Sequence, residues 1–185
     1  SIYGFGLLKD INPGSSSVAP YWYPVEAYND GSQLYFFSSN NVNGMELWKS
    51  DGTESGTTMI KDINPGVSDS YHASDIKMSF AAIGSTVFFP ASDGTNGIEL
   101  WKTDGTESGT SMVKDINSGS GSSAPYSLFS WDSNDEVYFF ANDGTNGFEL
   151  WKTDGTESGT TMVKNIYSGA TGAANDQCGY SDVDC

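Results

Sequence analysis

The chain has 185 residues and a formal net charge of −16, from 8 basic and 24 acidic side chains. Its length is sufficient for one well-buried domain, and its negative charge argues against nucleic acid or an anionic membrane surface as a partner. No run approaches the roughly 18 apolar residues of a membrane-spanning helix, so we expect no membrane insertion. Cations, sugars and other proteins, including further copies of the chain, are the remaining partners.

In chain order, the first predicted element is an N-terminal strand within residues 1–12. Its apolar residues are Phe5, Leu7, Leu8 and Ile11, and its LLKDINPG sequence matches the end of a longer unit that recurs three times. The strand is therefore one more than three complete units need. It either caps the first unit of its own chain or pairs with the open edge of another copy, which would build a polymer.

The three units follow at about 18–63, 71–116 and 122–166. Each is predicted to contain four strands: a loosely patterned first strand (19–28, 74–83 and 124–132), an aromatic second strand ending at Phe37, Phe89 and Phe140, a third reading MELWK, IELWK or FELWK, and a fourth reading TMIKDI, SMVKDI or TMVKNI. β-Branched and aromatic residues fill these segments, glycine and Asx residues separate them, and no segment has a 3.6-residue apolar period. The sequence predicts an all-β chain.

The repeat period indicates how the units are arranged. Trp48, Trp101 and Trp151 recur about 50 residues apart, which is in the range of propeller blades. We expect one propeller-like repeat domain over 1–169, made of about three four-stranded units. Since closed propellers have four to eight blades, the alternatives are a threefold β-prism or trefoil, or an arc completed by a neighbouring subunit.

Glu-Leu-Trp-Lys-Ser/Thr-Asp-Gly-Thr stands at 46–53, 99–106 and 149–156. This motif resembles the ELWxxDGT repeat family, which is found in tandem in large secreted proteins. The resemblance implies a propeller-like fold and an extracellular location. It supplies no catalytic residues.

The turn DGTESGT, which begins at Asp51, Asp104 and Asp154, is rich in oxygen ligands and is a weak candidate for calcium binding. Only its first and fourth positions carry charge, and the EF-hand spacing is absent. An Asx-turn, in which the aspartate accepts backbone N–H bonds, is the favoured interpretation.

The repeated glutamates before each tryptophan are expected to pack between units and to accept backbone hydrogen bonds. If the tryptophans were exposed instead, they could stack on sugar rings. Tyr21, Trp22 and Tyr23 lie outside the repeated positions and are better candidates for a carbohydrate-binding patch. His72 is the only histidine, so no catalytic relay or zinc cluster is indicated, and we expect no enzymatic activity.

Cys178 and Cys185 are the only cysteines, and both lie in the tail 170–185. A local disulfide between them is expected, which implies an oxidising compartment; a cross-link to another chain is the alternative. Taken together, the sequence predicts an extracellular or cell-surface structural protein that self-associates through its N-terminal strand, possesses no catalytic site, and contacts other extracellular proteins or glycans. The competing hypothesis is a calcium-supported, lectin-like adhesion module.

Overall fold

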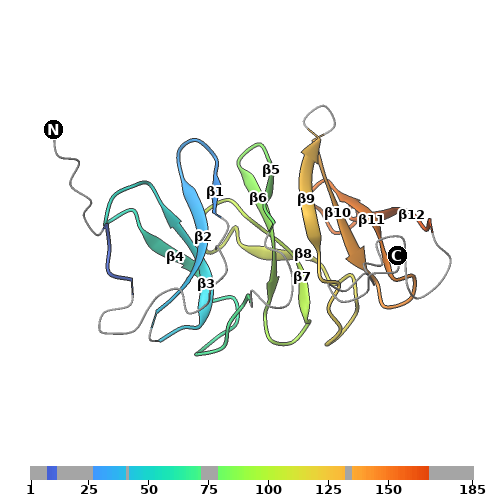
Figure 1. The fold of residues 1–185 in the computed structure, drawn as a ribbon, viewed down its shortest axis with the longest axis horizontal. Coiled ribbons are helices and arrows are strands. Elements are labelled where there is room, and N and C mark those ends of the chain that lie inside the picture. Colours follow the sequence, from blue (N-terminus) through green and yellow to red (C-terminus); the bar gives the residue numbers. More distant parts are fainter. Residues whose placement is uncertain (1–7, 12–26, 41, 72–78, 132–134, 167–185) are drawn as a thin grey trace, which may run out of the picture.

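The structure, a computed structural model, describes residues 8–11, 27–40, 42–71, 79–131 and 135–166. These residues form twelve strands and no helix, in three four-stranded antiparallel sheets that lie in a row (Figure 1). Sheet 1 contains β1 (Tyr28–Asn29), β2 (Leu34–Ser39), β3 (Met45–Ser50) and β4 (Thr58–Lys61). Sheet 2 contains β5 (Ala81–Ile83), β6 (Thr86–Ser92), β7 (Ile98–Thr103) and β8 (Ser111–Lys114). Sheet 3 contains β9 (Tyr126–Trp131), β10 (Glu136–Asn142), β11 (Phe148–Thr153) and β12 (Thr161–Lys164).

Within each sheet the strands pair in sequence order, so every sheet is one repeat unit. The register is the same in all three: the tryptophan of the third strand lies opposite an aromatic residue of the second, in the pairs Phe36 with Trp48, Phe89 with Trp101 and Phe139 with Trp151. Each third strand also shifts register against the fourth beside its tryptophan. The repeated sequence therefore specifies a repeated sheet, including its irregularity.

Two hydrophobic cores join the sheets, one at each junction. In the first core, Phe37, Leu47 and Ile63 of sheet 1 and its following loop pack with Phe89 and Trp101 of sheet 2. The second core joins the opposite face of sheet 2 to sheet 3, and its members include Phe88, Leu100, Ile116, Phe139 and Trp151. Each sheet thus has a leading face, toward the preceding sheet, and a trailing face, toward the following one.

The predicted all-β class and the three four-stranded units are confirmed. Of the first strands predicted in units 1 and 2, the described residues form β1 and β5, while 19–26 and 74–78 lie outside the described residues. One core joins sheets 1 and 2, the other joins sheets 2 and 3, and sheets 1 and 3 lie at opposite ends of the row (Figure 1), so the described strands do not form a closed threefold prism or trefoil.

The N-terminal strand is not formed in residues 8–11, the described part of that prediction. Among the described residues, this segment is held by a side chain: Lys9 Nζ donates to the carbonyl of Thr57, at 2.6 Å, and to that of Glu54. Leu8 remains nearly half exposed. Phe5 and Leu7 lie outside the described residues.

Within the described part of the chain, no helix is long and apolar enough to cross a membrane.

Candidate functional site

The three DGTESGT turns are built by hydrogen bonds from their own residues. Asp104 Oδ1 accepts from the backbone N–H and the hydroxyl of Thr106, and Thr106 Oγ1 accepts from Gly109 N. Asp51 and Asp154 make the same bonds. These bonds lower the pKa of all three aspartates, the hydroxyl of the following threonine having the largest effect.

The Asx-turn interpretation is therefore confirmed for these aspartates. No group of three or more His, Cys, Asp or Glu side chains among the described residues is arranged to hold a metal ion. In each turn the Oδ1 atom of the aspartate is used to fix the turn.

Glu46, Glu99 and Glu149 are fully buried and accept backbone hydrogen bonds, as the sequence predicted. Glu99 accepts from the backbone of Ile116, Asn117 and Ser123 and from the Ser123 hydroxyl. Burial raises the pKa of Glu46 and of Glu99 to about 7, although the hydrogen bonds oppose this shift. These glutamates tie the loop after each fourth strand to the third strand.

The repeated tryptophans are buried, which rules out stacking of Trp48, Trp101 or Trp151 on a sugar. The other predicted sites lie outside the described residues: Tyr21, Trp22 and Tyr23 for carbohydrate, and Cys178 and Cys185 for the disulfide. Those assignments stay predictions.

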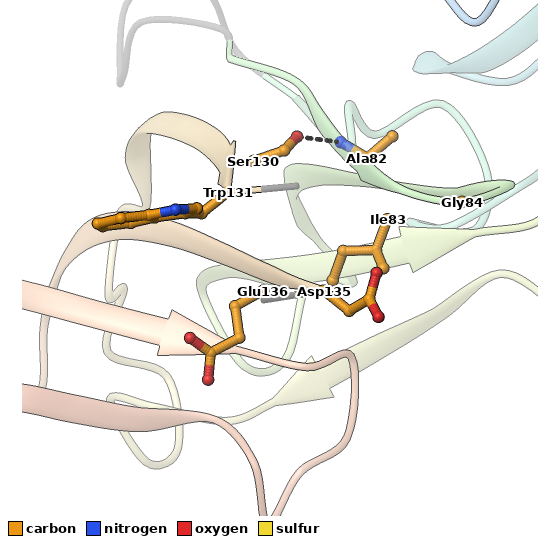
Figure 2. A pocket seen from close by; sticks show the side chains of 7 residues that line it. All are labelled: Ala82, Ile83, Gly84, Ser130, Trp131, Asp135 and Glu136. Atoms are coloured by element: carbon orange, nitrogen blue, oxygen red, sulfur yellow. Dashed lines mark hydrogen bonds between the residues drawn. The ribbon is translucent and has the colours of Figure 1, made fainter. Parts of the chain in front are cut away.

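A recess of about 230 Å³ lies where β5 meets β9 and β10 (Figure 2). Backbone of Ala82, Ile83 and Gly84 borders one side, and Ala82 N donates to Ser130 Oγ at 3.2 Å. Asp135 and Glu136 supply carboxylates, and the Trp131 side chain beside them is 53% exposed. Sequence reasoning did not single out these residues; the signal was that only the third unit has a tryptophan and a glutamate at the start of this hairpin.

Lysines bridge the sheets at every junction. Lys49 and Lys102, in the third strands of sheets 1 and 2, donate to the carbonyls of Gly105 and Gly155 in the next sheet, at 2.8 and 2.7 Å. Lys61 and Lys114, in the fourth strands, donate to the carbonyls of Thr110 and Thr160. The bond from Lys9 to Thr57 repeats this second contact, so residues 8–11 hold the place that the end of a preceding sheet would occupy.

An aromatic ring completes each junction at the glycine that accepts the lysine. A Cβ on Gly105 would come within 3.1 Å of the Tyr35 hydroxyl oxygen, and a Cβ on Gly155 within 3.2 Å of the Cζ atom of the Phe88 ring. The equivalent glycine of sheet 1 is Gly52, which has nothing within 4 Å of such a Cβ. Among the described residues, Gly52 of sheet 1 therefore has no side chain against it, whereas Gly105 of sheet 2 and Gly155 of sheet 3 each have an aromatic side chain there.

At the other end of the row, apolar side chains on the trailing face of sheet 3 are exposed. Val163 is 46% exposed and Ile166 is 61% exposed, whereas the equivalent Val113 and Ile116 of sheet 2 are 6% and 7% exposed. Lys152, which would bridge to a following sheet, instead pairs with Glu136 of its own sheet at 2.7 Å. In sheets 1 and 2 the residues equivalent to Lys152 are the bridging lysines, Lys49 and Lys102. The residues equivalent to Tyr138 are Tyr35 and Phe88, which lie against the glycines.

No protein-family model and no curated protein sequence matches the chain. Among solved structures, a chain of a nidogen/laminin complex is similar over 73% of this chain and 44% of its own length, with 13% identity and a TM-score of 0.44. A structure from a study of two prolyl endopeptidases is similar over 75% of this chain and 19% of its own length, with 14% identity and a TM-score of 0.46. This chain thus spans less than half the length of either structure.

Proposed function

We propose that the chain is an extracellular, non-catalytic structural protein whose copies associate end to end. The row of sheets would continue from one copy into the next as a propeller-like arrangement, with the N-terminal segment at each junction. The ELWxxDGT resemblance and the predicted disulfide support the extracellular location.

The exposure of the two end faces is the observation that carries this proposal. Val163 and Ile166 occupy positions that are buried wherever another sheet follows. At the other end Leu34 is 39% exposed, while its equivalents Val87 and Val137 are at most 1% exposed. The two ends of the row are therefore incomplete halves of the same apolar junction, and joining them would remove both exposed surfaces from water.

The N-terminal segment supports the same arrangement. Its Leu8-Lys-Asp-Ile11 is close in sequence to Val163-Lys-Asn-Ile166, at the end of sheet 3. Lys9 already makes the contact with Thr57 that a preceding sheet would make. In the assembly, the segment of one copy would add beside β12, the last strand of sheet 3 of its neighbour, which is strand addition between identical subunits.

The proposal is tested by the size of the purified chain as a function of concentration. Light scattering and electron microscopy should find chains of copies for the wild type. Deletion of residues 1–12, or the substitution Ile166→Asp, should leave monomers. Val67→Asp is the matched control, since Val67 is also exposed but lies in the loop after β4. Monomers of the wild type at millimolar concentration, or unchanged assembly of both variants, would overturn the proposal.

The recess beside Trp131 favours a second candidate, a saccharide-binding role. An exposed indole can pack on the C–H face of a pyranose, and the two carboxylates beside it can accept hydrogen bonds from the sugar hydroxyls. Trp131→Ala should abolish retention on immobilised neutral polysaccharides, while Tyr28→Ala, at the edge of sheet 1, should not. If the wild type binds none of a broad glycan panel, with or without calcium, this candidate is wrong.

A further inference from the structure

We infer that the turn at Gly52 is a docking site for sheet 3 of a second copy, which supplies Tyr138 and Lys152. This inference rests on the proposed end-to-end association and identifies which residues meet. It predicts a third version of a contact that the chain already makes twice.

The two internal junctions define what such a contact requires. The end of an aromatic side chain from the second strand of one sheet, the Tyr35 hydroxyl or the Phe88 ring, lies against a glycine of the next sheet, and a lysine from the adjacent third strand donates to that glycine's carbonyl. The ring and the lysine are directly opposite each other across the strand pair: Tyr35 with Lys49, and Phe88 with Lys102. Both act on one glycine because they leave the same face of their sheet.

Sheet 3 has the donor half of this contact. Tyr138 and Lys152 lie opposite each other across β10 and β11, in the register of the two internal pairs. The side chain of Lys152 is 38% exposed, and its ammonium has three donors, of which Glu136 takes one. It can therefore reach a carbonyl of a second copy without giving up its ion pair.

The surroundings of Tyr138 fit a protein partner. Phe129 stacks on Tyr138, with ring centroids 5.5 Å apart, and Trp131 lies against it at 5.6 Å. Both neighbours are about half exposed. With the partly buried Tyr138 they place three aromatic side chains on one face, and aromatic side chains are enriched in interface cores, where they lose water on binding.

Sheet 1 has the acceptor half. Gly52 follows Asp51 in a turn equivalent to those of Gly105 and Gly155. Its φ of 86° matches their values of 85° and 87°. Its amide is bonded to Ser50 Oγ, as the other two are bonded to Thr103 and Thr153. The turn is thus already in the conformation that receives a ring and a lysine.

A second copy is the occupant because the required groups recur in this chain in the correct register. A ligand of another kind would have to reproduce an aromatic ring and an ammonium at the same spacing. The contact joins unlike faces, so the association is head to tail and either extends as a filament or closes as a ring.

Site-specific photo-crosslinking tests the inference. With p-benzoyl-phenylalanine in place of Tyr138, irradiation of the full chain should give a covalent dimer, and mass spectrometry should place the cross-link in residues 49–57 of the second copy. The same probe at Val42, an exposed loop position, should not label that turn. In parallel, Tyr138→Ala and Lys152→Met should each weaken association at least about tenfold, while Lys164→Met should have a smaller effect.

The outcomes separate this inference from the proposed function. If copies associate but the probe at 138 labels another surface, the docking site at Gly52 is wrong and end-to-end association stands. If copies never associate, both are wrong. A dimer cross-linked at 49–57, together with weaker association of the two variants, supports both.

Discussion

The environment of Glu99 differs strongly from that of an ordinary, solvent-exposed carboxylate. It is fully buried, and burial raises its pKa to about 7, as it does for Glu46. Because the folded-state pKa lies above the value of 4.5 expected when unfolded, the folded state binds more protons between these values. The stability that these groups contribute is complete below pH 4.5 and is lost as the pH rises through 7.

We therefore expect the free energy of unfolding to fall between pH 5 and pH 8. Denaturant titrations at several pH values would measure this slope. Glu99→Gln should roughly halve it, because only Glu46 then titrates with a value near 7. Glu54→Gln, in an exposed turn, should leave it unchanged. A flat profile in the wild type would show that Glu46 and Glu99 stay ionised throughout.

Lysines offer a second test at the residue scale, in a matched pair. Lys114 Nζ donates to the carbonyl of Thr160 in sheet 3 at 2.9 Å, whereas its equivalent Lys164 makes no hydrogen bond to the described residues. Lys114→Met should cost about 1 kcal/mol of unfolding free energy, since it leaves a partly buried carbonyl unpaired. Lys164→Met should change it by less than about 0.5 kcal/mol. Equal losses would mean that the bridging bond adds nothing to stability.

At the scale of elements, the fourth strands and their following loops differ in burial although their sequences nearly coincide. Ile116 is buried between sheets 2 and 3, but Ile166 at the open end is exposed. Ile116→Ala should therefore cost about 2–4 kcal/mol, and Ile166→Ala under about 0.5 kcal/mol, in monomeric protein. Thermal denaturation at low protein concentration would compare them. A large loss at Ile166 would indicate that it is covered in solution.

The four strands of each unit could be predicted because their residue preferences and turn sequences agree. The alignment of the second strands with one another could not be predicted. Residue type alone places Phe37, Phe89 and Phe140 at equivalent positions, but Phe89 pairs with Trp101, whereas Phe37 and Phe140 pair with leucines. Pro90 holds the equivalent place in sheet 2. A shift of one residue reverses which face a side chain occupies, so an alignment by residue type alone misplaces Phe89.

The candidate site was less predictable, because it depends on which neighbours are missing. Lys49, Lys102 and Lys152 stand in nearly identical sequence contexts, as do Gly52, Gly105 and Gly155. Their positions in the row, and for Lys152 its pairing with Glu136, distinguish Lys152 and Gly52 at the ends from the joined members. The sequence could indicate a surplus N-terminal strand, but not that Lys9 would lie against Thr57.

On the scale of the whole molecule, net charge and apolar ends act in opposite directions. Each copy carries a formal charge of −16, so two copies repel each other at long range. The proposed junction is instead short-range, made of apolar side chains and a lysine bound to a backbone carbonyl. Salt screens the repulsion, with a Debye length of about 10 Å at 0.1 M, but has little effect on apolar contact at such concentrations.

Association should therefore strengthen as salt is added, in contrast to an assembly held by ion pairs. We expect sedimentation velocity at 20 mM and 300 mM NaCl to show a larger mean size at the higher salt, with the difference lost in the Ile166→Asp variant. Because only the folded chain associates, the melting temperature should also rise with protein concentration. If salt instead dissolves the assembly, charged contacts hold the copies together, and the apolar face of Val163 and Ile166 is not the surface that joins them.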